Sequence, residues 1–234
     1  MPSKKIVFVI VEGPSDDETL GLLLSRIYNK AEVFVYITHG DITTQAKSNS
    51  ILSKIGSLIK DYAKSNHLKK KNFQEIIHII DTDGAYIPDD AVIEDAYAEN
   101  PVYSLTKIST KNVNGIRSRN AMKSGCLDKM SSTTAIWDVP YHTYYMSCNL
   151  EHILHDIMNT SNQEKENKAF CFAQKYKDDI AGFIEFISSS SFSVNGEYRE
   201  TWHYIKDGLH SLERHTNLGI CLKAVRLRET QSNL

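Results

Sequence analysis

Four acidic side chains follow closely on two strongly apolar segments of the chain. Glu12 comes directly after one apolar run, and Asp16 follows four residues later. Asp81 and Asp83 come directly after another apolar run. Because successive side chains of an extended backbone alternate in direction, we expect Asp81 and Asp83 to point to the same side. The glycine beside each group, Gly13 or Gly84, permits a tight turn after the run.

Carboxylates that lie this close together repel one another unless a cation neutralises them. Oxygen ligands of this kind select hard divalent ions such as Mg²⁺ or Mn²⁺. One such ion polarises a phosphate and activates water, and two can hold both sides of an in-line displacement. The chemistry indicated is metal-assisted reaction at a phosphate, with one or two ions.

A purely structural interpretation of the same acids is also open. Glu12 and Asp16 are placed to cap a following helix, and Asp81 and Asp83 are compatible with a plain acidic turn. Either group alone would favour that interpretation. Both groups at equivalent ends of strands in one sheet favour a shared site.

The apolar patterns around these acids predict the elements that position them. Residues 6–11, 32–38 and 76–80 are apolar and rich in β-branched side chains, which favours buried strands. A helix capped by Ser15 or Asp16 and running to about Tyr28, and a second helix over 48–65, separate them. This order predicts an α/β fold in which helices flank a parallel sheet. Ligands bind where the strands of such sheets end.

The second half of the chain carries weaker signals. The pattern blurs over 85–135, a strand is expected at 141–146, and a helix is expected to start at Asn149. We therefore expect an α/β metal-binding domain over 1–135 and a mainly helical C-terminal extension over 136–234. The helices expected in the extension are 169–176, 180–188 and 201–214.

These motifs resemble the TOPRIM domain, a metal-binding fold shared by topoisomerases, bacterial primases, recombination-repair proteins and OLD-family nucleases. The family has a glutamate-glycine pair after its first strand, here Glu12-Gly13, and an Asp-x-Asp after a later one, here Asp81-Thr82-Asp83. The stretch VEGPSDDETL is similar to the usual start of OLD-type nucleases. The resemblance implies a TOPRIM/Rossmann-like fold over about residues 5–90.

The resemblance also implies roles for individual residues. Glu12, Asp16, Asp81 and Asp83 would form the metal-binding set for Mg²⁺ or Mn²⁺. Glu12, Asp81 and Asp83 would be the catalytic residues, with Glu12 also able to transfer protons. OLD-type domains often supply another acid from a later segment, and Glu151 is the candidate here. The alternative for Glu151 is a helix N-terminal acid favoured by the helix dipole.

A basic segment between the two halves supplies candidates for contact with nucleic-acid phosphates. It contains Lys107, Lys111, Arg117, Arg119 and Lys123, and one of these would hold the phosphate during reaction. We assign Lys107, Lys111, Arg117 and Arg119 to nucleic-acid binding. The alternative is a solvated charged surface.

The bulk composition narrows the setting. A net charge of −2 provides no overall basic field that would indicate a nucleic-acid or membrane partner, although a local basic patch remains compatible with it. The four cysteines have no C-x-x-C spacing, which argues against a zinc site and a disulfide framework. No stretch approaches the length of a membrane span, so we expect a cytoplasmic protein without a membrane partner.

The sequence as a whole therefore predicts a Mg²⁺-dependent TOPRIM nuclease that hydrolyses phosphodiesters of DNA or RNA. The chain lacks a Walker A sequence, so the resemblance implies a separate ATPase subunit and a role in anti-phage defence. Two other classes stay open: a non-catalytic TOPRIM binding module, and another Mg²⁺-dependent phosphotransfer enzyme. Self-association into a homo-oligomer also stays open.

Overall fold

The computed structural model describes residues 4–231, and its centre is a five-stranded sheet of order β2-β1-β3-β8-β7. The strands β1, β2, β3 and β8 run parallel to one another, while the short β7 is antiparallel to β8. The fold is therefore α/β with a mostly parallel sheet, as the alternation of strands and helices predicts. The strands are β1 (Ile6–Val11), β2 (Glu32–Ile37), β3 (Phe73–Asp81), β7 (Ala135–Ile136) and β8 (Val139–Met146).

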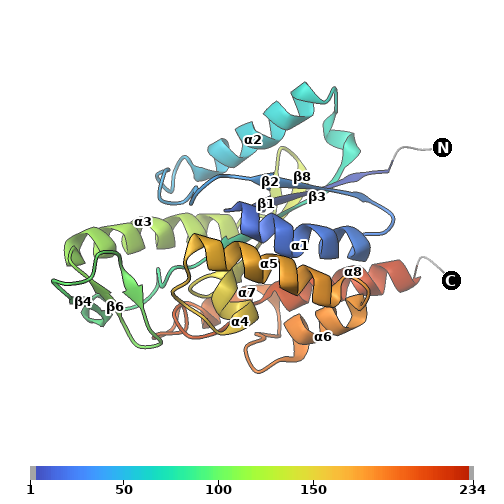
Figure 1. Cartoon of the computed structure of the whole chain (residues 1–234). Helices are drawn as coiled ribbons and strands as arrows, with labels where there is room; N and C mark the ends of the chain where they lie inside the picture. Colours follow the sequence, from blue (N-terminus) through green and yellow to red (C-terminus); the bar gives the residue numbers. More distant parts are fainter. Residues whose placement is uncertain (1–3, 232–234) are drawn as a thin grey trace.

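Helices cover both faces of this sheet. Helices α1, α5, α6 and α8 bury one face, and α2 and α3 bury the other, as Figure 1 shows. The helices are α1 (Pro14–Ile27), α2 (Ile51–Ser65), α3 (Val113–Ser131), α4 (Leu150–His155), α5 (Asn162–Tyr176), α6 (Ile180–Ser189), α7 (Tyr198–Tyr204) and α8 (Leu218–Gln231), with short 3₁₀ turns at Lys70–Asn72 and Asp89–Ala91.

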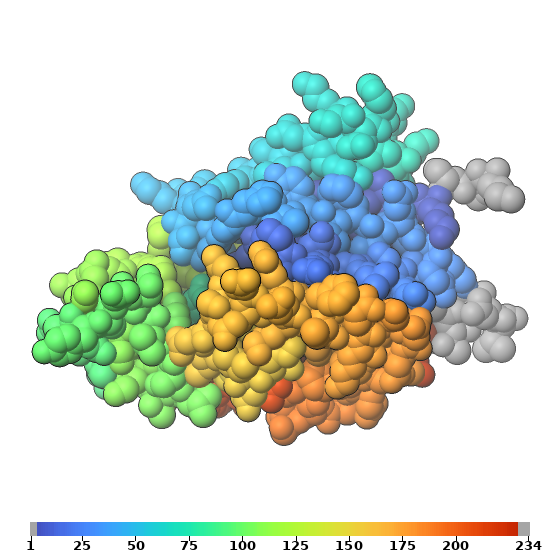
Figure 2. All heavy atoms as spheres, viewed as in Figure 1, coloured from blue at the N-terminus to red at the C-terminus, as the bar shows by residue number. Residues whose placement is uncertain are grey.

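A small second sheet of order β4-β6-β5 stands beside the main one. It contains β4 (Val92–Glu94), β5 (Val102–Tyr103) and β6 (Ile108–Thr110) and has its own small apolar core. In Figure 2 this part forms the green lobe at the left of the molecule. It brings residues near position 100 to the side of the main sheet.

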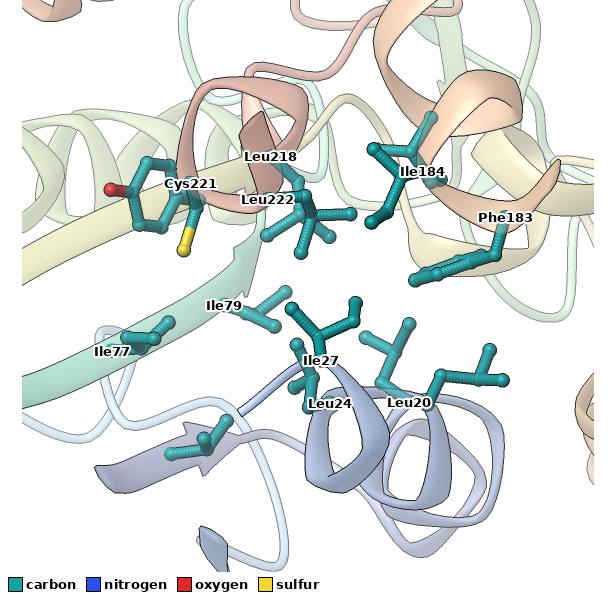
Figure 3. Packing of buried hydrophobic residues seen from close by; sticks show 14 of the residues in the cluster. Leu20, Leu24, Ile27, Ile77, Ile79, Phe183, Ile184, Leu218, Cys221 and Leu222 are labelled. Carbon is teal, nitrogen blue, oxygen red and sulfur yellow. The ribbon is translucent and has the colours of Figure 1, made fainter. Parts of the chain in front are cut away.

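Alternation along β1 explains why its six residues are all buried. The odd-numbered residues of β1 belong to the core under α1 and α8, and the even-numbered ones belong to the core under α2 and α3. Figure 3 shows the first of these cores, in which Leu24 and Ile27 of α1 lie close to Ile79 of β3, with Leu218 and Leu222 of α8 across the core from them. Each such side chain contributes about 1.5–3 kcal/mol on burial, so the strand that precedes Glu12 is firmly held.

The expected strands at 6–11, 32–38, 76–80 and 141–146 correspond to β1, β2, β3 and β8. The last of these pairs with β3 in the main sheet. The division of the chain at residue 135 stays a prediction.

The helix expected at 201–214 is wrong beyond Tyr204, where α7 ends. Gly208 has a positive φ of 51°, and the following segment turns back to the main sheet. There the Asn217 side chain accepts a hydrogen bond from the Tyr145 N–H. These contacts with β8 outweigh local helix preference. The sequence patterns also missed α3, whose apolar residues are interrupted by buried polar side chains, and α8.

Gly84 provides a test of the turn that follows β3. Its φ is +68°, and a Cβ there would lie 2.7 Å from the Leu212 side chain, which is fully buried. We expect Gly84→Ala to lower the free energy of unfolding by about 2–4 kcal/mol, combining left-handed strain with overpacking. The measurement is urea denaturation.

Gly208→Ala is the matched control, because Gly208 also has a positive φ but nothing lies within 4 Å of an added Cβ. Gly208→Ala should lower the free energy of unfolding only by the cost of the left-handed conformation, about 1–2 kcal/mol. Equal losses for the two variants would contradict the contact with Leu212.

Candidate functional site

The two acidic motifs meet at the carboxyl end of the main sheet. Glu12 follows β1 and Asp81 ends β3, and these two strands are parallel neighbours. The Asp81 backbone N–H donates a hydrogen bond to Glu12 Oε1 at 3.3 Å, across 69 residues of sequence. Parallel pairing therefore places one acid of each motif in direct contact.

Asp16 lies in the first turn of α1, close to Glu12. Its Oδ2 accepts a hydrogen bond of 2.8 Å from the Gly13 N–H. The expectation that Ser15 or Asp16 caps this helix is wrong, because Gly13 occupies the N-cap position and the helix begins at Pro14. Proline suits a first helical position since it has no N–H to satisfy.

A buried lysine lies among the carboxylates. The Lys123 side chain is fully buried, and its Nζ is 2.6 Å from Asp83 Oδ2, 2.9 Å from Asp41 Oδ2 and 3.7 Å from Glu12 Oε1. The lysine comes from α3 and Asp41 from the loop after β2. One ammonium group therefore links three separate segments of the chain.

The sequence indicated Lys123 only as one of several basic residues that could hold a phosphate, and it did not indicate Asp41. Asp41 follows a strand just as Glu12 and Asp83 do, so the same rule would have found it. On α3, Ile116, Lys123, Leu127 and Met130 are all buried, at helical spacing. A lysine inside such an apolar stripe is the signal, since lysine is almost never fully buried without a partner.

A second lysine faces the other acids of the group. Glu151, in the first turn of α4, is buried, and its Oε2 lies 3.1 Å from Lys165 Nζ of α5. Burial lowers the pKa of Lys165, but Glu151 and Asp81 outweigh that effect and raise it above its ordinary value. Two lysines, Lys123 and Lys165, thus lie near six acids: Glu12, Asp16, Asp41, Asp81, Asp83 and Glu151.

Burial and mutual repulsion make several of these carboxylates hard to ionise. Burial, followed by the charges of Asp41, Asp83 and Asp16, raises the pKa of Glu12 to about 8 although Lys123 opposes the shift. Burial, with Glu12 the next cause, raises the pKa of Asp81 well above its ordinary value. The two lysines do not fully compensate the negative charge at this point.

Lys123 itself stays charged. Burial alone would lower the pKa of its ammonium group, but Asp83, Glu12 and Asp41 hold that pKa well above the ordinary value. The pKa of Asp41 is correspondingly lowered despite burial, because of Lys123 and hydrogen bonds from Thr43. Lys123 with Asp41 is therefore a stable ionised pair.

Thr82 holds the loop between the two aspartates of the second motif. Its Oγ1 donates to Ser211 O at 2.8 Å and accepts from the Cys148 N–H at 3.0 Å. The Asp83 N–H donates to Cys148 O at 2.9 Å. These bonds join the loop to the end of β8 and to the segment after α7, so the carboxylates of Asp81 and Asp83 have a fixed backbone beneath them.

A cleft of about 600 Å³ opens beside the acids. Glu12, Asp81 and Asp83 line one side, and Lys165 lines it from α5. The opposite wall is polar and mostly uncharged: Asn100, Pro101, Tyr103, Asn149 and Met158–Ser161. The Asn159 side chain donates to Tyr103 O at 2.8 Å and accepts from the Tyr103 N–H at 2.9 Å, which joins the small sheet to this wall.

The four basic residues assigned to nucleic-acid binding lie in different surroundings. Arg119 is at the site, where its guanidinium donates to Asp83 O at 2.7 Å and to the Tyr103 hydroxyl at 2.5 Å. Arg117 donates to Asp89 O and supports the small sheet instead. Lys107 and Lys111 are exposed, and neither lines the cleft. The segment does not form one continuous basic surface at the acids.

The donor chemistry of the cleft fits a hard divalent ion. Glu12, Asp16 and Asp81 offer carboxylate oxygens only, and burial, together with neighbouring carboxylates, raises their pKa values. Asp83 and Asp41 are already paired with Lys123. Within residues 4–231, no group of three or more His, Cys, Asp or Glu side chains is arranged so that it could hold a metal ion. Side-chain adjustment would have to accompany binding of an ion.

Comparisons with known proteins found no relative of this chain. No protein-family model matches the chain, no curated protein matches it, and no solved structure matches it. Among the helices of the described residues, none combines the length and apolarity needed to cross a membrane.

Replacing Lys123 tests its role in holding the acids together. In Lys123→Met the carboxylates of Asp83 and Asp41 lose their buried partner, so we expect the free energy of unfolding at pH 8 to fall by about 3–5 kcal/mol. At pH 5 the loss should shrink, since the acids can take up protons. The matched control is Lys129→Met, an exposed lysine on the same helix, and it should change stability little. Equal stability of the two variants at pH 8 would contradict the buried ion pairs.

The raised pKa of Glu12 predicts a pH dependence of stability. Between pH 6.5 and 8 the unfolded Glu12 carboxyl has lost its proton while the folded one retains it, so rising pH favours unfolding. In metal-free buffer the slope should be about −1 kcal/mol per pH unit for such a group. Denaturant titration at several pH values measures it, and Glu12→Gln should flatten the slope.

Mg²⁺ should act in the opposite sense. Because an ion stabilises the ionised acids, it should raise the melting temperature more at pH 8 than at pH 6, where protons compete for Glu12. A melting temperature independent of Mg²⁺ at pH 8 would argue against a divalent-ion site.

Proposed function

We propose that the chain is a TOPRIM-type, Mg²⁺-dependent nuclease that hydrolyses phosphodiester bonds of DNA or RNA. The observation that carries the proposal is the contact between Glu12 at the end of β1 and Asp81 at the end of β3. This contact brings the glutamate-glycine and Asp-x-Asp motifs together at the carboxyl ends of the strands, where ligands bind in α/β folds. Manganese has the same ligand preference and would serve equally.

The charge balance of the site supports a divalent cation there. Glu12, Asp16 and Asp81 would hold the ion, whereas Asp83 and Glu151 are each already paired with a lysine. When bound, Mg²⁺ would polarise a phosphate and lower the pKa of water. The metal-binding role is thus proposed for the acids that most lack positive charge.

The chain's own residues would do the rest. Glu12, whose pKa burial raises to about 8 in the metal-free site, would accept a proton from the attacking water. Lys165 lines the cleft and would offer positive charge to the phosphate. Arg119 lies behind Asp83 and would stabilise the loop under the reacting group. Asn100 and Tyr103 supply the uncharged wall against which a nucleotide would rest.

The wider setting in the proposal follows from the resemblance to OLD-type nucleases. It includes a separate ATPase subunit, a role in anti-phage defence and a cytoplasmic location. Copurification with an ATPase encoded nearby would test the first of these.

The enzyme is tested by incubating the protein with Mg²⁺ and four polymers: single- and double-stranded DNA and RNA. We expect cleavage of at least one polymer, inhibition by EDTA, and a loss of at least 100-fold in rate for Glu12→Gln and for Asp81→Asn, since each removes an oxygen-ligand charge. Product gels measure the rates, and circular dichroism checks that the variants fold.

Glu18→Gln is the matched control, because Glu18 is an exposed acid on the same helix as Asp16. It should cleave at the wild-type rate. Unchanged cleavage by Glu12→Gln would rule out the proposed chemistry. Turnover of a small phosphoester without polymer cleavage would indicate another phosphotransfer enzyme, and no turnover of any substrate would indicate a binding module.

A further inference from the structure

The outer edge of β2 is long, apolar and open. β2 lies at one end of the main sheet, and within residues 4–231 its strand partner is β1 alone. Residues 33–37 are five consecutive apolar side chains, all partly exposed in the single chain.

The two edges of the main sheet differ in how they are protected. At the far edge β7 has only two residues, and the strand beside it carries Pro140. Short strands and prolines are devices that keep sheet edges from pairing. β2 has six residues without proline or lysine, and its register with β1 runs without a bulge. An unprotected apolar edge of this length indicates a pairing surface.

The backbone groups of β2 alternate between the two sides. The Glu32 N–H donates to Lys5 O and the Thr38 N–H donates to Val11 O, so even-numbered residues face β1. Val33, Val35 and Ile37 therefore present their N–H and C=O groups to the open side. These groups are the ones that an additional strand would engage.

We propose that two copies of this chain pair through β2, antiparallel about a two-fold axis at Val35, so that the two main sheets become one. Val35 then faces Val35 of the second copy, and Val33 faces Ile37, each pair exchanging both backbone hydrogen bonds. Phe34 lies opposite Tyr36 at the non-hydrogen-bonded positions, where side chains approach most closely. The interface is isologous, as two-fold symmetry requires.

The strand is complementary to itself in this register. Aromatic side chains meet aromatic ones and β-branched ones meet β-branched ones, both favourable cross-strand pairs. The single charged residue of β2, Glu32, lies opposite Thr38 of the second copy, so no like charges meet. Antiparallel pairing also directs the two carboxylate clusters toward opposite ends of the joined sheet, which leaves both clefts open. The inference is independent of the proposed function.

Val35→Pro tests the interface. Because the Val35 N–H faces away from β1, proline there removes no hydrogen bond within one chain, and its neighbours are already extended. It removes a donor and adds bulk at the centre of the proposed pair. Val35→Thr keeps the N–H and the strand preference, and it serves as the control.

Light scattering after size-exclusion chromatography measures the mass. The wild type and Val35→Thr should have twice the 26.6 kDa chain mass, and Val35→Pro should have the single-chain mass with an unchanged circular dichroism spectrum. A wild-type monomer at 100 µM, roughly a hundredfold above a typical micromolar Kd, would overturn the proposal. A dimer that persists in folded Val35→Pro would also overturn it.

Amide hydrogen exchange on the wild type decides the matter if Val35→Pro does not fold. In the dimer the amides of Val33, Val35 and Ile37 should exchange at least tenfold more slowly than in dilute protein, while those of Phe34 and Tyr36 are protected at every concentration. Rapid exchange of the three outward amides in a concentrated sample would overturn the proposal. Pairing of the edge with a different protein only, the wild type alone being monomeric, would overturn it as well.

Discussion

The pairing of the fully buried Lys123 with largely buried carboxylates is the interaction on which the site depends. Its ammonium group lies 2.6 Å from Asp83 and 2.9 Å from Asp41, and it is wholly removed from water. Breaking such a pair costs more than never forming it, because the remaining charge stays buried. One cation thereby ties α3 to the loops after β2 and β3. The acids at the carboxyl ends of the strands are compatible with folding because α3 supplies that cation.

The compensation of the negative charge by the two lysines is incomplete, and the proposed function rests on this imbalance. Two lysines stand near six carboxylates, and the pKa of Glu12 remains at about 8. Carboxylates with raised pKa values clustered at one end of a sheet whose strands are buried on both faces are the observation behind the proposed metal site. A divalent ion is the partner that the oxygen donors fit. In the proposed function, the hydrogen-bonded Thr82 loop would support the acids, and the cleft beside Lys165 would admit a phosphate.

Strand pairing determines where the acids meet, and it also determines which outer strands of the main sheet are protected or open. Parallel neighbours β1 and β3 bring Glu12 to Asp81, and β8 extends the same sheet under the loop of Asp83. The sheet ends at β7 in a short, protected edge and at β2 in a long apolar one. The proposed chemistry thus lies at the carboxyl ends of the strands, and the proposed pairing of two copies lies along the outer side of β2.

Local patterns determined the four parallel strands of the main sheet, the first two helices and the α/β class, because apolar periodicity and strand-end glycines are properties of short segments. They also predicted that Glu12, Asp16, Asp81 and Asp83 belong near one sheet edge. Only the tertiary structure decided that Asp41 and Lys123 join them, and that Arg119 is at the site while Lys107 is not. It also ended the expected helix after Tyr204 and formed α3 around buried polar side chains. The physical reason is that a lysine on a helix looks solvated in sequence, and only packing shows which charge it meets.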